Sequence, residues 1–271
     1  MLSVGFVIYN PEKDFVDRVE LLKEAGYSVY IFDNSPEYTR ADKKLQKLYD
    51  VNYFTCGKNL GLGVGITTIC FNAYNENFEA LLFFDQDTCF TKETLEYVTT
   101  FYQFRKDEFK SYAAIQFSNK ILNSGGAIEM KFKLEQKMLL ISSGSLFNLK
   151  NLKNLNWHNT NYFVDGVDYE FSLRANCTRY LLAEVTSTPG FDHITGQEDK
   201  AYFILERKLY LRAYNHSRLG DIYLSYLKLI IMSFRNLKLK YLLIFFKSLL
   251  QFTFYQLIVR VLNFINKYER N

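Results

Sequence analysis

The sequence predicts an α/β fold, in which a Rossmann-like, mainly parallel sheet carries helices on both faces and is followed by a C-terminal helical extension. Three observations lead to this prediction. Short runs of β-branched and aromatic residues alternate with amphipathic segments through the first 117 residues. Hydrophobic residues make up 48% and charged residues 23% of the 271, so the chain can bury a large core and is not disordered. After Gly220 few helix-breaking residues remain.

The first part of the chain is expected to alternate strands with helices. The expected strands are 2–8, 28–32, 51–55, 80–84 and 112–117. The expected helices between them are about 11–25, 41–49, 64–77 and 91–109, and the first should open at Pro11 and close near Gly26. Strands separated by helices pair in parallel, because each helix returns the chain to the same end of the sheet.

The middle of the chain, about 118–200, is less regular. It contains in order a hairpin signal at Gly125-Gly126, an apolar segment at 138–147, a helix that includes Asp165 to Arg174, and a strand at 180–185. From residue 200 to the end the pattern predicts helices.

Polar side chains follow each of the first four predicted strands. They are Tyr9-Asn10-Pro11, Asp33-Asn34-Ser35, the segment 57–63 with Asn59, and Asp85-Gln86-Asp87. One polar loop would be an ordinary turn. Four in succession at the carboxyl edge of a parallel sheet, where ligands bind in such folds, predict a binding site.

The glycines at 61, 63 and 65 lack the spacing and the position of a dinucleotide fingerprint. They are better explained by a tight turn from strand to helix, which leaves Asn59 free to contact a ligand.

Asp85 and Asp87 end a buried strand and, two residues apart on an extended chain, project to the same side. Such a pair suits a hard divalent cation that also binds substrate phosphates. It leaves three enzyme classes open: a dehalogenase-like phosphatase, a sugar nucleotidyltransferase and a sugar transferase. Cys89 stands where the phosphatase motif has Thr or Val, and the first strand is not followed by a glycine-rich loop as in the nucleotidyltransferases. Both observations favour the sugar transferase.

In their order along the chain, these motifs resemble the inverting family-2 glycosyltransferases, and most of all the bacterial rhamnosyltransferase-type enzymes of cell-surface polysaccharide assembly. The motifs are Val7-x-Tyr9-Asn10-Pro11, Phe32-Asp33-Asn34-Ser35, Asn59-x-Gly61, Phe84-Asp85-Gln86-Asp87, Ser143-Gly144-Ser145, Asp165-x-x-Asp168-x-Glu170-x-x-x-Arg174 and His193-x-x-Gly196. The resemblance covers about residues 1–215. It implies an A-type glycosyltransferase fold, a nucleotide diphosphate sugar donor, a catalytic Mg or Mn ion and inversion at the anomeric carbon.

The resemblance also implies roles for individual residues. The nucleotide-sugar site would contain Tyr9, Asn10, Asp33, Asn59, Asp85 and Asp87, with Asp33 near the nucleoside and Asp85 near the ribose and sugar. Asp87 and His193 would bind the metal ion that bridges the diphosphate. Ser143, Gly144 and Arg174 would belong to the loop between acceptor and donor. For Arg174, an ion pair with Glu170 four residues earlier on the same helix is the alternative.

The acceptor hydroxyl needs a positioned carboxylate to take its proton. Aligned on Leu173-Arg174, Asp168 occupies the base position of the family. Asp165, one helical turn earlier, is the alternative base. His158 and His216 have no motif around them and are expected to be structural.

Charge is distributed unevenly along the chain, with 21 basic and 26 acidic residues before residue 201 and 12 basic and 3 acidic residues from there on. We expect a catalytic domain at 1–218, with a nucleotide-sugar half at 1–117 and an acceptor half at 118–218, and a basic amphipathic helical tail at 219–271. The apolar and basic tail suits an anionic membrane surface. The alternative is that the tail packs on the catalytic domain or on a second copy, as in a homo-oligomer joined through these helices. Nucleic acid is not expected, because the tail is too apolar to follow a phosphate backbone.

The expected location is the cytoplasm, peripheral on the cytoplasmic face of the inner membrane. The N-terminus lacks the basic region of a signal peptide, and the four cysteines show no pairing pattern. Spaced lysines and arginines are expected to keep every apolar run of the tail below the ~20 residues of a membrane span.

The sequence therefore predicts a metal-dependent inverting glycosyltransferase. It would move L-rhamnose, or otherwise another hexose, from a nucleotide diphosphate to a hydroxyl of a glycan or lipid-linked glycan in cell-surface polysaccharide synthesis. Two alternatives stay open: a catalytically degenerate, membrane-associated scaffold of the same fold, and a phosphate-ester hydrolase that uses Asp85 and Asp87.

Overall fold

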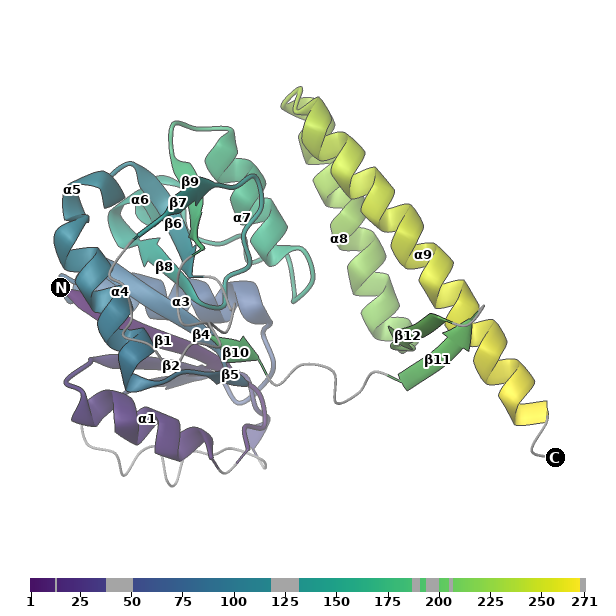
Figure 1. Ribbon diagram of the computed structural model, residues 1–271, viewed down its shortest axis with the longest axis horizontal. Coiled ribbons are helices and arrows are strands. Elements are labelled where there is room, and N and C mark those ends of the chain that lie inside the picture. The colour runs from purple at the N-terminus through teal and green to yellow at the C-terminus, as the bar shows by residue number, and fades with distance from the viewer. Residues whose placement is uncertain are drawn as a thin grey trace. The chain divides into compact units, whose positions relative to one another are not determined.

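The computed structural model describes residues 1–12, 14–37, 51–117, 132–186, 191–193, 200–204 and 207–268 (Figure 1). The chain forms two compact units, Met1–His193 and Ile194–Asn271, and each is described by itself. This division precedes the expected boundary at 218/219. The expected helix at 41–49 and the hairpin signal at Gly125-Gly126 lie outside the described residues.

The first unit is built on an eight-stranded sheet in the order β3-β2-β1-β4-β8-β6-β9-β7. The strands are β1 (Leu2–Ile8), β2 (Val29–Asp33), β3 (Val51–Thr55), β4 (Ala80–Asp85), β6 (Tyr112–Phe117), β7 (Leu134–Gln136), β8 (Ser145–Asn148) and β9 (Leu181–Val185). β3, β2, β1 and β4 are parallel, as are β6 and β9. β8 runs antiparallel between β4 and β6, and β7 runs antiparallel to β9. The six strands predicted from the sequence are confirmed to within one residue.

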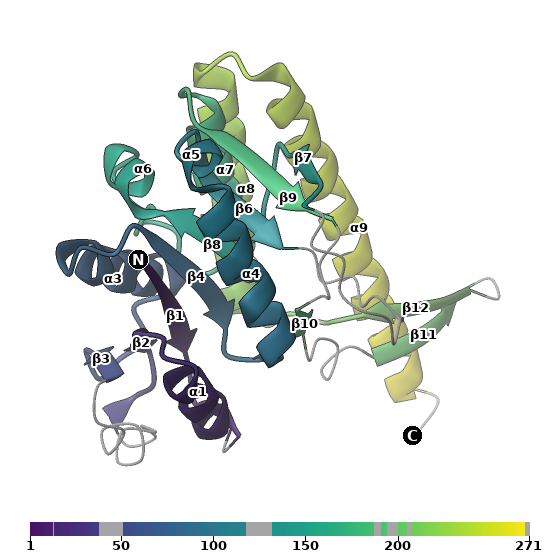
Figure 2. The same cartoon turned by 60° about the vertical axis from the view of Figure 1, so that its left-hand side comes forward.

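Helices cover both faces of this sheet, as predicted (Figure 2). On one face, α1 (Phe15–Glu24) and α4 (Lys92–Phe104) pack against Val4, Phe6 and Ile8 of β1. The other face carries α3 (Leu62–Asn75), α6 (Leu149–Asn154) and α7 (Val167–Asn176). The short helix α5 (Lys106–Phe109) follows α4. Alternate residues of each central strand thus point into two different cores, which explains why these strands are apolar throughout.

Two elements differ from the expectation. Helix α1 begins at Phe15 instead of Pro11, because the chain first crosses the edge of the sheet, where the backbone amides of Tyr9 and Asn10 are held by side chains of other loops. The segment after residue 200 begins with a hairpin, β11 (Lys200–Ile204) and β12 (Arg207–Leu211), where helices were expected. Tyr202, Phe203 and Ile204 of β11 and Tyr210 of β12 favour extended structure over helix.

The second unit continues with an antiparallel pair of helices, α8 (His216–Arg235) and α9 (Leu239–Tyr268), which lie side by side (Figure 1). Their buried residues are Ile222, Ser225, Leu229 and Ser233 of α8 and Tyr241, Phe245, Gln256 and Val259 of α9. The expectation that no apolar run reaches membrane-spanning length is wrong. The helical segment Leu239–Phe264 is long and apolar enough to cross a membrane. Its most apolar window has a mean hydropathy of 1.6, and 17% of that window is buried. The reason is that Lys247 is the only charged residue between Tyr241 and Val259.

Candidate active site

The candidate site lies at the carboxyl ends of the parallel strands. There the loops that follow β1, β2 and β4 are joined by short hydrogen bonds. The backbone N–H of Tyr9 donates to Oε1 of Gln86 at 2.6 Å, and the N–H of Asn10 donates to Oγ of Ser35 at 2.7 Å. Three of the four polar loops predicted from the sequence therefore meet directly.

Asp33, the expected nucleoside ligand, is fully buried at the end of β2. Its Oδ1 accepts the backbone N–H of Ser35 at 2.7 Å, and its Oδ2 accepts the hydroxyl of Tyr53 at 2.5 Å. The carboxylate therefore fixes the turn after β2, and the half-buried Tyr53 joins this turn to β3, the strand in which it lies.

Asn34 joins the loop after β3 to this group. Its Oδ1 accepts the N–H of Leu60 at 2.9 Å, and its Nδ2 donates to the carbonyl of Gly61 at 3.2 Å. Asn59, which the sequence predicts to contact a ligand, is exposed and uses its Oδ1 to accept the N–H of Gly61 at 2.9 Å. The fourth polar loop thus belongs to the same edge.

Asp85 ends β4 beside the loop that leads into the antiparallel strand β8. Oγ of Ser143 accepts the N–H of Asp85 at 3.0 Å and lies 2.7 Å from the hydroxyl oxygen of Thr88. Gly144 donates its N–H to the carbonyl of Phe83 at 2.8 Å. Ser143 and Gly144 therefore lie beside Asp85, where they support the end of β4.

Asp168 lies in the first turn of α7, at the same edge of the sheet. The hydroxyl and the backbone N–H of Ser142 both donate to its carboxylate. Asp165, the alternative base, precedes the helix and contributes negative charge near Asp168. Adjacent residues of one loop, Ser142 and Ser143, thus contact the acid of each half of the chain.

The negative charges of Asp87 and Asp168 act on the carboxyl group of Asp85, and these three residues are named here the acidic group. Burial, together with the negative charges of Asp168 and Asp87, raises the pKa of Asp85 to about 7. Burial and the charge of Asp165 likewise raise the pKa of Asp168, against the lowering effect of its hydrogen bonds from Ser142. The early acidic pair and the late acid, far apart in the sequence, therefore lie within electrostatic range of each other.

His193, the second expected metal ligand, lies in the two-residue strand β10 (Asp192–His193), which pairs antiparallel with β5 (Thr88–Cys89). His193 stands opposite Thr88, the residue after Asp87. The backbone register thus brings His193 next to Asp87, while its side chain lies outside the described part of the structure.

The residues at this edge fit a divalent cation that is shared with a substrate. Asp85, Asp87 and Asp168 concentrate negative charge that a cation would offset, and carboxylate oxygens suit Mg or Mn. Within the described residues, no three His, Cys, Asp or Glu side chains are grouped closely enough to hold an ion alone. A cation at this edge would take one or two of these carboxylates as ligands and complete its shell with water and phosphate oxygens.

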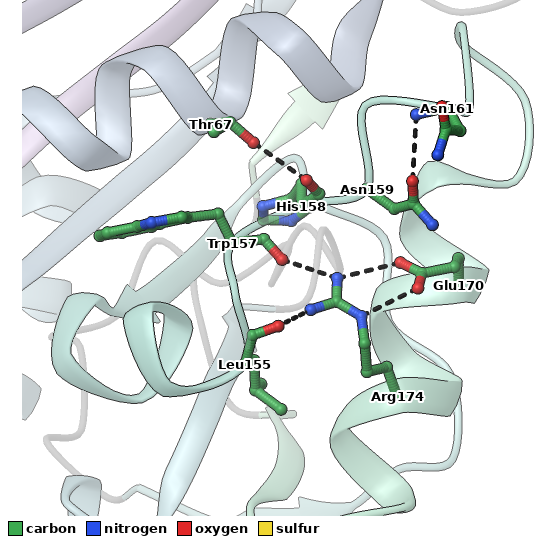
Figure 3. A network of polar contacts seen from close by, with 8 residues as sticks. All are labelled: Thr67, Leu155, Trp157, His158, Asn159, Asn161, Glu170 and Arg174. Carbon is green, nitrogen blue, oxygen red and sulfur yellow. Dashed lines mark hydrogen bonds and ion pairs between the residues drawn. The ribbon is translucent and has the colours of Figure 1, made fainter.

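The guanidinium of Arg174 points toward Glu170 and toward the loop before α7 (Figure 3). Its guanidinium forms a two-pronged ion pair with Glu170, at 2.8 and 3.0 Å, and donates to the carbonyls of Leu155 and Trp157. The ion pair with Glu170 that the sequence offered as an alternative is confirmed. These contacts hold the loop before α7 against the helix.

His158 lies in this loop, and it is structural, as expected. Its ring stacks on Phe171 at 4.7 Å between centroids and meets the edge of Phe147. Neither ring nitrogen has a hydrogen-bond partner in the described part of the chain. Burial and the nearby charge of Arg174 lower the pKa of His158 to about 3.

The His158→Phe variant should therefore change the pH dependence of stability. Between about pH 6 and pH 4 the unfolded state takes up a proton at residue 158 that the folded state does not, so wild-type stability falls with decreasing pH by about 1.4 kcal/mol per unit relative to the variant. Urea unfolding of both proteins across this range measures the difference. The difference should be constant above pH 7, and a constant difference throughout would contradict a neutral buried imidazole.

The turn before α3 has room only for glycine. Gly61 has φ +89°, and an added Cβ would lie 2.4 Å from the carbonyl oxygen of Phe163. The N–H of Leu62 donates to the same carbonyl at 2.5 Å. The loop after β3 is thereby joined to the segment that leads to Asp165 and Asp168, and the turn expected from the glycine run is present.

Gly61→Ala should lower the free energy of unfolding by about 3 kcal/mol, because it combines backbone strain with a clash against main chain. Gly26→Ala is the matched control, since Gly26 has φ +82° with no atom within 4 Å of an added Cβ. The control should lose only about 1 kcal/mol from strain. Equal losses in urea unfolding would mean that the contact with Phe163 has no energetic effect.

Sequence reasoning did not assign several residues that organise the site. Ser142 contacts Asp168, Tyr53 contacts Asp33, and Gln86 receives the N–H of Tyr9. Ser142 could have been identified from the sequence, because it begins the polar run Ser142–Ser145 within an apolar segment. Tyr53 is one aromatic residue among many in predicted strands and carries no such signal.

Comparison with solved structures identifies the fold. It is similar to that of TarS from S. aureus, with a TM-score of 0.52 and 20% identity over 73% of this chain and 37% of that one. The structure of TarS residues 1–349 in complex with UDP gives a TM-score of 0.51 and 20% identity over 70% of this chain and 59% of that one. This chain therefore spans less than two thirds of either. No protein-family profile and no curated protein sequence matches it. The expected A-type glycosyltransferase fold with a C-terminal helical extension is confirmed.

Proposed function

We propose that the protein is a metal-dependent inverting glycosyltransferase that moves a sugar from a nucleoside diphosphate to a hydroxyl of a glycan or lipid-linked glycan. One observation carries the proposal: Asp85 and Asp87 from the early strands and Asp168 from the later helix gather at the carboxyl edge of one sheet. A single displacement needs a donor site and a proton acceptor side by side, and this edge offers both.

In this proposal Asp168 takes the proton of the acceptor hydroxyl as that oxygen attacks the anomeric carbon. Ser142 orients the carboxylate, and burial brings its pKa nearer to neutral pH, which makes it a stronger base than an exposed aspartate. Asp165 remains the alternative base. Tyr9, Asn10, Asp33 and Asn59 would shape the nucleoside side of the site.

A Mg or Mn ion held by Asp87 and His193 would neutralise the charge that develops on the leaving diphosphate. Asp85 would bind the ribose and sugar beside it. The TarS neighbour in complex with UDP supports a nucleoside diphosphate in a fold of this shape. The resemblance in sequence favours L-rhamnose, otherwise another hexose, and assembly of a cell-surface polysaccharide.

A binding screen tests the proposal. Calorimetry with UDP, dTDP and GDP, with and without Mn²⁺, should find one that binds, and more tightly with the metal; its sugar conjugates would then be assayed for transfer. Absence of binding by all three would favour a degenerate scaffold of the same fold. Release of inorganic phosphate without an acceptor would favour a phosphate-ester hydrolase at Asp85 and Asp87.

We further propose that the α8–α9 pair attaches the protein to an anionic membrane, on the cytoplasmic face of the inner membrane. The turn between the helices exposes Phe234, Leu237 and Leu239 by 67%, 82% and 66%. Arg235, Lys238 and Lys240 alternate with them. Exposed apolar side chains interleaved with cations fit the boundary of acyl chains and acidic headgroups.

The Phe234→Glu/Leu237→Glu double variant should lose at least about 90% of its binding to phosphatidylglycerol vesicles in flotation, because each inserted apolar side chain contributes about 1.5–3 kcal/mol. Phe104→Glu, which changes a 78% exposed phenylalanine of α4, is the control and should float like wild type. High salt should release a peripheral anchor and would leave a spanning helix in place. Equal flotation of both variants would contradict a membrane anchor. A wild-type dimer that dissociates in the double variant would also contradict it, and would show that the helices bind a second copy of the chain.

A further inference from the structure

A cavity lies at the opposite edge of the sheet from Asp85, Asp87 and Asp168. Its volume is about 820 Å³, within the usual range of ligand sites. It is bordered by the ends of α3, α4 and α6 and by the loops that lead into β4, β6 and β9. Glu79 on its wall and Asp85 in the candidate site are six residues apart along β4, which corresponds to about 20 Å.

The floor and walls of this cavity are held rigidly. Nδ2 of Asn151 donates to the carbonyls of Lys110 and Tyr112 at 2.9 and 2.7 Å. The hydroxyl of Tyr102 donates to Glu79 at 2.6 Å, and Nδ2 of Asn154 donates to the hydroxyl of Tyr180 at 2.7 Å. A ligand would therefore enter a preformed site and would order few side chains.

Aromatic, amide and basic side chains make up most of the lining. The aromatic residues are Tyr74, Phe78, Tyr102, Phe109 and Tyr180; the amides are Asn75, Asn77, Asn148, Asn151 and Asn154; the basic residues are Lys106, Lys110, Lys150 and Arg179. The half-buried rings of Tyr74, Phe78 and Tyr180 can pack on the apolar faces of sugar rings. The exposed amides of Asn75, Asn77 and Asn154 can bond to hydroxyl groups, and Arg and Lys bind carboxylates or phosphates. This combination fits a saccharide that carries negative charge.

The charge available for a ligand is limited. Lys106 pairs with Glu79 at 2.5 Å, and Lys110 pairs with Asp107 at 2.6 Å. Lys150 and Arg179 are exposed and have no ion-pair partner within the described ranges. Two available cations suit a glycan with a charged group on some of its rings, and they fall short of what the continuous phosphate backbone of a nucleic acid requires.

We propose that this cavity, named here the amino-edge groove, binds an anionic glycan away from the reacting atoms. The inference rests on the proposed function, because a glycan is the natural ligand of an enzyme that extends one. Binding here would retain a long acceptor chain on the enzyme while its end reacts at the acidic group. Short acceptors, which cannot span the distance between the two edges, would gain nothing from the groove.

Binding of an oligogalacturonate, measured by calorimetry on the full chain without donor, tests the proposal. The Lys150→Ala/Arg179→Ala variant should bind it at least about tenfold more weakly than wild type, because two charge-assisted contacts are lost. The Lys92→Ala/Lys133→Ala variant, which removes two exposed lysines outside the groove, should bind like wild type. An uncharged maltodextrin of the same length should bind more weakly than the oligogalacturonate.

Nucleoside diphosphate binding, measured on the same samples, separates this inference from the proposed function. Retained nucleotide binding together with weakened glycan binding in the groove variant supports the groove. Three results would overturn it: no binding of oligogalacturonate to wild type, equal binding by both double variants, or tighter binding of a single-stranded oligonucleotide than of the glycan. If the wild-type protein did not bind a nucleoside diphosphate, the result would contradict the proposed transferase function and not the groove.

Discussion

The Asp168→Asn variant should transfer sugar at least about a hundredfold more slowly than wild type and bind the nucleoside diphosphate with unchanged affinity. The amide keeps the shape of the carboxylate and still accepts a hydrogen bond from Ser142, but it cannot take a proton from the acceptor hydroxyl. The measurement is the rate of nucleoside diphosphate release with acceptor present, combined with calorimetry of nucleotide binding. The loss should appear in the turnover rate and leave donor binding intact.

Asp165→Asn is the matched control, since it makes the same chemical change three residues earlier. It removes one negative charge near Asp168 and should reduce the rate only modestly. If Asp165→Asn abolished transfer while Asp168→Asn retained it, the base would be Asp165. Full transfer by both variants would exclude a carboxylate base on this segment.

The Asp87→Ala variant should lose the increase in nucleotide affinity that Mn²⁺ provides. We expect at least about a hundredfold weaker binding in the presence of the metal, since even outer partners of a metal site typically contribute about tenfold to hundredfold. Without metal, wild type and variant should bind alike, because Asp87 would contact the nucleotide through the ion. Calorimetric titrations with and without Mn²⁺ measure both quantities.

Asp107→Ala is the control for the loss of a negative charge. Asp107 is 94% exposed on α5 and lies outside the acidic group. Its removal should leave the metal-dependent affinity unchanged. A metal effect that survives in Asp87→Ala would show that Asp87 is not a ligand.

Most of the early half of the fold can be predicted from sequence, because two signals mark each strand. One is the apolar run of the strand itself, and the other is the polar loop that follows it. Asp33 and Asp85 illustrate this, since both end predicted strands and both lie at the predicted edge. The direction of β8 could not be predicted. An apolar segment at 138–147 has the same composition whether its strand runs parallel or antiparallel.

Other misses have the same kind of cause. The pattern i, i+4 for Glu170 and Arg174 indicates an ion pair, but it does not say that the guanidinium also binds the carbonyls of Leu155 and Trp157. The apolar stretch of α9 is longer than predicted, because Lys247 is the only charged residue between Tyr241 and Val259 and the prediction did not take this spacing into account. The contacts of Arg174 depend on its tertiary partners, and the apolar stretch of α9 depends on the spacing of charges along the helix. Local composition alone predicts neither.

The reversed direction of β8 has a consequence for how Asp85 and Asp168 are held relative to each other. In the loop that enters β8, the hydroxyl of Ser142 donates to the carboxylate of Asp168, and Oγ of Ser143 accepts the backbone N–H of Asp85. Neighbouring α-carbons, about 3.8 Å apart, therefore tie the start of α7 to the end of β4. One peptide unit thus links the two elements that carry these acids. An insertion or deletion between Ser142 and Ser143 would therefore change the distance between the start of α7 and the end of β4, whereas the same change in a loop that contacts neither residue would not.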